Sequence, residues 1–405
     1  MKRPASKRPA APRVKKRKPS ATDPWADVPS KELDSSTSLD AASKLPTCFQ
    51  GFGPETFCNG GLRIGTDFSG LDTPAWALKL LNIDFKHTFG CDMERASQKL
   101  MKHLGVHTMY SDITKRPVEE TPDVDLYVFT PPCQPFSKSG KRKGIACSKN
   151  GPLVMHSLDY IKHHKPAMIL MEQVPDLMRG KFKVIFDMII DILREIGYHL
   201  SWQILKSSDY GTPQQRQRLY IQGTLVQVSK FPAPRPSTPP LTTFLDKLDN
   251  RQWRPLPDED IDGKLRLNNV RDHLEKHAKT GLNCFKTPII ITTGASKAHS
   301  SSMVDRMMTL TKTEAGRRGY WCTWKGGFLE KHELARMQGY PDKLIPWDDL
   351  GLSAHQVGKL MGNAMTLTVV MNVLPELLRA SGKISQMQFL QLQKRAQGFE
   401  VMDCL

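Results

Sequence analysis

The sequence predicts an α/β fold built on a mostly parallel sheet with helices on both faces. Between residues 62 and 227, short apolar runs alternate with amphipathic stretches, and strands that alternate with helices form βαβ units. Several apolar runs end in Gly, Asp or Glu, and ligands of open α/β sheets bind at such strand ends. With 405 residues, 39% of them hydrophobic, the chain can bury one large core and a smaller second one.

The expected elements follow one another up to residue 225. Pro74 opens a helix, prolines stop one buried strand, and Gly197 ends a long amphipathic helix, each in a position that the residue favours. The expected strands, with their closing turns, are 62–70, 85–92, 125–132, 167–174, 199–205 and 218–225, and the expected helices are 73–83, 93–104, 152–164 and 182–197.

The pattern changes after residue 227. Residues 228–326 are rich in Pro, Thr, Asn and charge and show no βα alternation, so we expect a small separate domain or a long insertion. Helical periodicity returns in 327–382, which we assign with 62–227 to the same core. A terminal tail or helix is expected at 383–405.

The net charge of +17 calls for an anionic partner, and nucleic acid is the obvious candidate. Residues 1–20 carry nine Lys and Arg and no acid, and the remaining 385 residues still carry +8. A Pro, Ala and Lys mixture cannot offset the entropy of ordering, so we expect a disordered basic tail at 1–47. Its basic clusters suit nuclear import, which predicts a protein of the nucleus.

The cysteines and apolar runs exclude other classes. The eight cysteines form no C-x-x-C pair and no zinc-like spacing, so we expect no metal site. No secretory signal is visible and no apolar run reaches about 18 residues, so we expect no membrane association. The thiols are expected to be reduced, and a functional thiol would be catalytic.

Three strand ends indicate a nucleoside pocket. Gly70 follows the first strand, where a turn into a helix directs N–H groups at a ligand. Asp92 ends the next strand, where a carboxylate can accept both ribose hydroxyls, and Asp112 follows a third. Each acid could instead cap the following helix, but the three junctions together favour the pocket.

Cys133 lies on a turn that two prolines stiffen, within "VFTPPCQPFSKSGKRKG". A thiol becomes a nucleophile where positive charge or N–H donors stabilise its thiolate, although a lone cysteine is more commonly a small buried hydrophobe. Glu172 ends an apolar strand, where burial is costly unless the carboxyl is paired or protonated. A structural ion pair would explain Glu172 equally well.

Gln214, Arg216 and Arg218 alternate where another strand begins. Period-two spacing puts all three side chains on one face of that strand, where they could hold a phosphate, a carboxylate or a flipped nucleotide. An ordinary edge-strand charge pattern remains an alternative.

In this order, the motifs resemble those of the C5-cytosine methyltransferases across residues 62–380. The specific signals are PPCQPFS at 131–137 and QQRQRLYI at 215–222, strengthened by RMQGYPD at 336–342 and MGNAM at 361–365. The resemblance implies a Rossmann-like S-adenosylmethionine-dependent methyltransferase sheet with a small target-recognition domain at 228–326. It also implies an enzyme of DNA methylation that acts on double-stranded DNA, and we expect it to be a monomer.

By this resemblance, Cys133 would attack C6 of a flipped cytosine, Glu172 would contact N3 and the exocyclic amine, and Arg216 would steady the base. The residues implied to bind S-adenosyl-L-methionine are Phe68, Ser69, Gly70, Asp92 at the ribose, Met93, Asp112 at the adenine amine, Ile113, Pro132, Asn363 and Ala364. The residues implied to contact nucleic acid are Gln134, Ser137, Lys138, Arg142, Gln214 and Arg218.

The chain departs from the family pattern in its first motif. Thr66 and Asp72 stand where the family usually has an acid and a second glycine, which keeps a catalytically silent DNA-binding regulator as an alternative. Gln173 replaces the family's Asn after Glu172. The intact Cys133, Glu172 and Arg216 favour an active enzyme.

The family's tRNA branch is the other alternative. That branch shares the Pro-Cys-Gln loop but carries a Cys-Phe-Thr signature, which Lys286 interrupts here in CFKT at 284–287. The basic tail and the long insertion favour DNA as the substrate.

Overall fold

The computed structural model describes residues 61–132, 153–246, 263–284 and 286–401. All of them belong to the unit that spans 44–405. The predicted tail at 1–47 and the segment from Cys133 onward lie outside the described residues.

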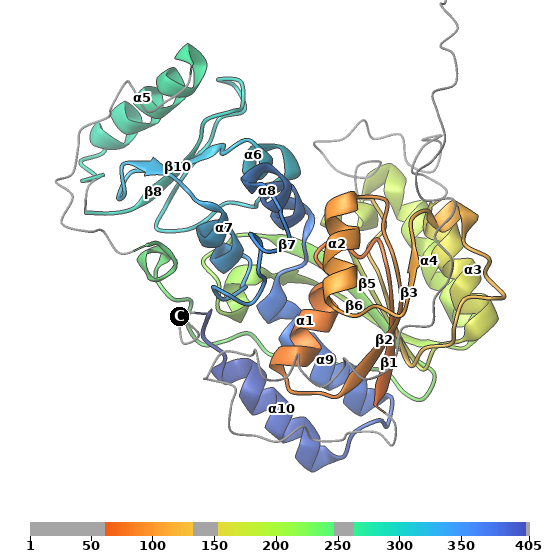
Figure 1. The fold of residues 1–405 in the computed structure, drawn as a ribbon. Coiled ribbons are helices and arrows are strands. Elements are labelled where there is room, and N and C mark those ends of the chain that lie inside the picture. The colour runs from red at the N-terminus through yellow and green to blue at the C-terminus, as the bar shows by residue number, and fades with distance from the viewer. Residues whose placement is uncertain (1–60, 133–152, 247–262, 285, 402–405) are drawn as a thin grey trace, which may run out of the picture. The chain divides into compact units, whose positions relative to one another are not determined.

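The core is a seven-stranded sheet of order β3-β2-β1-β4-β5-β7-β6 (Figure 1). Strands β1 to β5 pair in parallel, and β7 lies antiparallel between β5 and β6. Because the order reverses between β1 and β4, a ligand crevice is expected at the carboxyl ends of these two strands. The strands are β1 Leu62–Asp67, β2 Phe85–Cys91, β3 Thr108–Tyr110, β4 Leu126–Phe129, β5 Met168–Gln173, β6 His199–Lys206 and β7 Gln217–Thr224.

Alternate strand residues face two different hydrophobic cores, as period two requires. Leu126 and Val128 pack into a core with α1 Thr73–Leu80, α2 Arg95–His103, α9 Leu367–Ala380 and α10 Gln386–Gly398. Tyr127 and Phe129 pack into a second core with α3 Leu153–His164 and α4 Lys183–Ile196. Helices therefore cover both faces, which confirms the predicted fold class (Figure 1).

A small antiparallel sheet lies within the predicted insertion. Its order is β11-β10-β8-β9, with β8 Ile289–Thr292, β9 Ser302–Val304, β10 Tyr320–Cys322 and β11 Gly327–Phe328. Helix α5, Lys264–Ala278, packs on it through a separate core that contains Val270, Ile289 and Trp321. The sheet therefore ends two residues beyond the predicted boundary at 326.

Helix α6, Lys312–Gly316, lies between β9 and β10 in the chain, and α7 Lys331–Met337 and α8 Ala354–Asn363 connect the small sheet to α9. Helices α6 and α8 meet backbone to backbone, because a Cβ at Gly358 or Gly362 would overlap the main chain of Ala315 or Lys312. The described 3₁₀ turns are η4 Ile113–Lys115, η6 Pro175–Met178, η7 Gly180–Phe182, η8 Ser207–Tyr210 and η9 Leu241–Phe244.

Within the described ranges, no single helix has the length and hydropathy of a membrane span. Only α8 and α9 taken together, with a 42° bend between them, meet that test of length and composition.

Candidate active site

The turn after β1 holds the first site residues in an unusual backbone conformation. Phe68 and Gly70 both have φ of 56°, a left-handed region that favours glycine. A Cβ at Gly70 would meet only the Phe68 carbonyl oxygen, at 3.7 Å, so conformation rather than space requires this glycine. The Ser69 N–H donates to the Cys91 carbonyl at 3.1 Å, which fastens the turn to β2.

Asp92 connects the same turn to the end of β2. Its Oδ2 accepts from the Gly70 N–H and its Oδ1 from the Glu94 N–H, both at 2.8 Å. Burial raises the pKa of Asp92, and these two hydrogen bonds act in the opposite direction. Met93, the next residue, exposes 72% of its surface.

Asp112 lies beyond β3 and caps the 3₁₀ turn η4. Its Oδ1 accepts from the Thr114 N–H at 3.0 Å and from the Thr114 hydroxyl at 2.7 Å, and these bonds lower its pKa. The neighbouring Ile113 is buried. The capping alternative is therefore confirmed for Asp112, which is half-buried.

These side chains fit the nucleoside part of S-adenosylmethionine. The ends of the neighbouring strands β1, β2 and β3 carry N–H donors at the turn, the half-buried Asp92 and Asp112, and the exposed Met93. Carboxylates suit ribose hydroxyls and an adenine amine, and a flexible apolar side chain suits the face of a base.

The second half of the site surrounds Glu172, near the end of β5. Glu172 is 7% exposed, and its Oε1 lies 3.1 Å from Arg218 Nε and 3.9 Å from Arg216 Nη2. Burial raises the pKa of the Glu172 carboxyl, while Arg218 and then Arg216 act to lower it. The ion-pair alternative is thus realised, on a carboxyl that burial also predisposes to hold a proton.

The prediction that Gln214, Arg216 and Arg218 lie along one strand is wrong, although Arg216 and Arg218 both turn toward Glu172. Strand β7 begins only at Gln217, because the main chain before it pairs elsewhere: the Gln215 N–H donates to the Met307 carbonyl at 2.7 Å. Of the three residues, only Arg218 lies on the strand.

Gln214 and Arg216 are instead buried among backbone groups. Gln214 is fully buried, and its amide donates to the Met337 carbonyl at 2.9 Å and accepts from the Leu310 N–H at 3.4 Å. Arg216 Nη1 donates to the carbonyls of Leu310 and Gly362, at 3.2 and 3.4 Å. These bonds let Gln214 support the segment before β7, and its contact with nucleic acid stays a prediction.

The chain that leads to Cys133 is held from both halves of the site. The Gln173 amide donates to the Pro131 carbonyl at 2.7 Å, and the Thr130 hydroxyl donates to the Phe68 carbonyl at 3.0 Å. Pro132 is half-buried and ends the described segment. The sequence predicted neither contact. For Gln173, its position directly after Glu172 was the feature that could have indicated a role in the site. Cys133, Gln134, Ser137, Lys138 and Arg142 lie outside the described residues.

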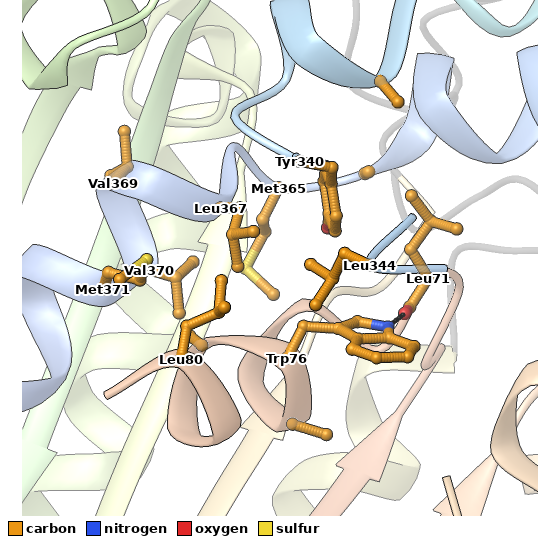
Figure 2. Close-up of a cluster of buried hydrophobic side chains, with 14 of the residues drawn as sticks. Leu71, Trp76, Leu80, Tyr340, Leu344, Met365, Leu367, Val369, Val370 and Met371 are labelled. Carbon is orange, nitrogen blue, oxygen red and sulfur yellow. Dashed lines mark hydrogen bonds between the residues drawn. The ribbon is translucent and has the colours of Figure 1, made fainter. Parts of the chain in front are cut away.

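Residues of the C-terminal segment pack beside the turn that contains Gly70, on the side of α1. Leu71, Tyr340 and Met365 share one hydrophobic cluster with Trp76 (Figure 2), and the Thr73 and Tyr340 hydroxyls lie 2.7 Å apart. Asn363 is exposed at the end of α8, and Ala364 is buried behind it. The structure therefore brings the MGNAM segment to the predicted cofactor turn.

No cluster of three or more His, Cys, Asp or Glu side chains in the described part of the chain could hold a metal ion. The described side chains of the site are carboxyl, guanidinium and amide groups. Together, the acids at the strand ends and the buried carboxyl near two arginines line the edge of the sheet at which open α/β folds bind their ligands.

The family follows from comparison with known proteins. The family model of C-5 cytosine-specific DNA methylases matches residues 67–379. The chain belongs to this family, and its enzyme class is DNA (cytosine-5) methyltransferase.

Several bacterial enzymes are similar in sequence. Type II methyltransferase M.HaeII of Haemophilus aegyptius is 24% identical over 316 residues, which cover 77% of this chain and 87% of that protein. M.DsaV of Dactylococcopsis salina is 23% identical over 72% of this chain and 80% of its own length. M.Bsp6I of a Bacillus species is 36% identical over 148 residues, 35% of this chain and 47% of the relative.

Solved structures show the same fold. The crystal structure of S. pombe Dnmt2 methyltransferase aligns with a TM-score of 0.53 and 18% identity, and covers 78% of this chain and 98% of that one. A putative DNA modification methyltransferase encoded within an E. coli prophage aligns with a TM-score of 0.55 and 18% identity, over 78% of this chain and 99% of that one.

Proposed function

We propose that this protein transfers a methyl group from S-adenosyl-L-methionine to C5 of a cytosine flipped out of double-stranded DNA, through a covalent bond between Cys133 and C6. The observation that carries the proposal is the position of Glu172. This buried carboxyl lies at the carboxyl end of β5, between Arg216 and Arg218, beside the strand that leads to Pro132 and Cys133.

The cofactor would lie against the ends of β1, β2 and β3. Asp92 would accept hydrogen bonds from the ribose hydroxyls, Asp112 would accept one from the adenine amine, and Met93 would cover the base. Phe68, Ser69 and Gly70 would line the methionine end, with Asn363 and Ala364 on the opposite side. When bound, S-adenosylmethionine supplies the methyl group that C5 accepts.

Glu172 is suited to move a proton at N3 of the base. When the Cys133 thiolate forms the S–C6 bond, the electron pair of the C5–C6 double bond shifts through C4 onto N3. A protonated Glu172 would donate its proton to N3, which leaves a neutral ring with nucleophilic character at C5. After C5 is methylated, a water molecule would take the C5 proton, that electron pair would re-form the C5–C6 double bond, and the S–C6 bond would break to release the thiolate. N3 would then return its proton to the Glu172 carboxylate.

The two arginines would compensate for the charge that this transfer creates. Once Glu172 has given up its proton, its carboxylate is buried, and an unpaired buried charge is costly. Arg218 Nε is already 3.1 Å from Oε1, so no side chain has to reorganise to stabilise the anion. Arg216, which is anchored on Leu310 and Gly362, would also contact the base.

The direct test is incubation of the full chain with S-adenosylmethionine carrying a labelled methyl group. Substrates are unmodified duplex DNA, hemimethylated duplex DNA and tRNA. We expect label in duplex DNA, and a covalent adduct with DNA that carries 5-fluorocytosine. Cys133→Ala should abolish both signals, while Cys58→Ala serves as a thiol control with full transfer. Label in tRNA alone would overturn the choice of DNA, and DNA binding without any transfer would favour the silent regulator.

We also propose a nuclear location and a monomeric state. The basic clusters in residues 1–20 support the first, although the relatives named above are bacterial proteins. A fluorescent protein fused to residues 1–47 should accumulate in the nucleus of a eukaryotic cell, and light scattering of the full chain should give the mass of one copy. A uniform cellular distribution or the mass of a dimer would contradict the respective proposal.

A further inference from the structure

A small buried polar network lies beneath the turn between β1 and α1, and the chemistry proposed above does not use it. Its members are Thr66 of β1, Asp72 at the start of α1 and His87 of β2, which expose 2%, 0% and 4% of their surfaces. Buried polar groups are costly unless they contact one another, so the three side chains act as a unit.

The Thr66 hydroxyl is the centre of this network. Its Oγ1 lies 2.8 Å from Ser69 Oγ, 3.3 Å from His87 Nε2 and 3.4 Å from Asp72 Oδ2. His87 Nε2 and Asp72 Oδ2 are themselves 3.5 Å apart. Through Ser69, the network reaches the turn whose Gly70 N–H donates to Asp92.

The backbone of Asp72 gives no reason for an aspartate at this position. Its φ of 58° and ψ of 47° lie in the left-handed region, which suits glycine best and which aspartate tolerates mainly through local hydrogen bonds of its side chain. An aspartate before a helix commonly caps it, but Asp72 makes no such side-chain bond. The inward contacts with Thr66 and His87 are therefore the reason that the structure offers.

Burial disfavours charge on both titratable members of the network. Burial raises the pKa of the Asp72 carboxyl well above its usual value, against the effect of the Thr66 hydrogen bond. Burial also lowers the pKa of His87 to about 3, an effect that Lys79 reinforces. A protonated carboxyl beside a neutral imidazole avoids the cost of a buried ion pair, and a neutral amide could take the place of the carboxyl.

We propose that Asp72 is a positioning residue for the cofactor. Through Thr66 it holds Ser69, and with it the turn in which the Gly70 N–H orients the Asp92 carboxylate toward the ribose. The contact between the Asp72 N–H and the Ser69 carbonyl, at 2.6 Å, closes the same turn from the other end. This inference rests on the proposed binding of S-adenosylmethionine at that turn.

Two substitutions at Asp72 distinguish an effect of the polar network on cofactor binding from an effect of the left-handed backbone conformation. Asp72→Gly relieves the left-handed conformation, so backbone preference alone predicts unchanged or tighter cofactor binding. Loss of the network predicts the opposite, since the Thr66 hydroxyl and His87 lose a buried partner. Asp72→Asn keeps a neutral acceptor of the same size and should preserve the network.

The assay is calorimetric titration of the full chain with S-adenosylhomocysteine. We expect affinity to fall at least about tenfold in Asp72→Gly and in Thr66→Val, and to stay within about threefold in Asp72→Asn. In methyl transfer to duplex DNA, KM for the cofactor should rise while kcat at saturating cofactor stays nearly constant. Lys343→Gly is the matched control, because Lys343 has φ of 62° but is exposed; its affinity should match that of the wild type.

The outcomes are distinguishable. If the wild type binds S-adenosylhomocysteine and Asp72→Gly binds it equally well, the positioning role is overturned. A tenfold loss of affinity in Asp72→Asn also overturns it. If Asp72→Gly does not fold, Thr66→Val decides, and unchanged affinity in that variant overturns the role. Failure of the wild type to bind S-adenosylhomocysteine refutes the proposed function itself, and this inference falls with it.

Discussion

Gln173→Leu should slow methyl transfer without weakening substrate binding. The Gln173 amide donates to the Pro131 carbonyl at 2.7 Å, and its own oxygen accepts from the Val174 N–H at 3.0 Å. Pro131 lies two residues before Cys133. This amide therefore joins the strand that carries Glu172 to the segment that leads to Cys133, the proposed nucleophile, and leucine removes both hydrogen bonds at similar volume.

The size of the effect follows from burial. Gln173 is 1% exposed, so the substitution leaves two buried backbone groups without their partner, at a cost of about 1–3 kcal/mol. If that free energy appears in the transition state as misplacement of Cys133, kcat falls by about fivefold to about 150-fold. KM for S-adenosylmethionine should change little, because none of the proposed cofactor contacts involves Gln173.

The assay is steady-state methyl transfer to duplex DNA with both substrates varied, together with the rate of covalent capture on 5-fluorocytosine DNA. Gln222→Leu is the matched control. Gln222 is also a fully buried strand residue whose amide donates to a backbone carbonyl, that of Lys230, at 2.7 Å, but it is remote from Pro131 in the sheet. Gln222→Leu should lower thermal stability and leave kcat unchanged.

A kcat within about twofold of wild type in Gln173→Leu would refute this reasoning. Equal losses of kcat in Gln173→Leu and Gln222→Leu would also refute it, because the effect would then be general destabilisation. Gln173→Asn, with the shorter amide common in the family, should fall between wild type and Gln173→Leu.

Three further predictions concern stability and charge. Arg116→Met removes the partner of the buried Asp67 carboxylate, and the free energy of unfolding measured in urea should fall by about 3–5 kcal/mol; a smaller loss in the double variant Asp67→Asn/Arg116→Met would confirm the pairing, and an equal loss would contradict it. Burial acts to raise the pKa of Asp125, but hydrogen bonds from Arg63 and Lys383 lower it to about 2. Because the unfolded chain then binds more protons, stability should decline as the pH falls from about 4 toward 2, and Asp125→Asn should flatten that decline; an unchanged profile would contradict the assignment. Deletion of residues 1–20 should weaken nonspecific DNA binding and reduce the slope of log affinity against log salt, whereas an unaltered slope would limit those nine basic residues to another role.

Much of the fold was predictable because its signals are local. Apolar runs, Pro74 in the first turn of α1, the prolines after β4 and Gly197 at the end of α4 mark elements that the structure contains. Boundaries were less accurate: α2 begins at Arg95, two residues later than expected. The small sheet at 289–328 was not predicted as a sheet, because its strands of two to four residues are too short for a clear period.

In the candidate site too, some residues were predictable from local patterns and others were not. Glu172, Gly70 and Asp92 stand at strand ends, and strand ends of a parallel sheet meet at one edge whatever the details of packing. The row of Gln214, Arg216 and Arg218 failed because periodicity assumes a continuous strand, and here Met307, far along the chain, pairs with the segment before β7. No local pattern could have indicated that competition.

The sequence by itself determined the fold class, the order of the motifs and the family, since these depend on residue type and spacing along one chain. The tertiary structure alone decided which side chains are partners. Arg218 lies closer to Glu172 than Arg216 does, Gln173 reaches Pro131, and Asp72 turns inward to Thr66 and His87. Each of these contacts requires that the side chains are buried from water and that segments distant in sequence lie close together. Both conditions are met only after the chain has packed.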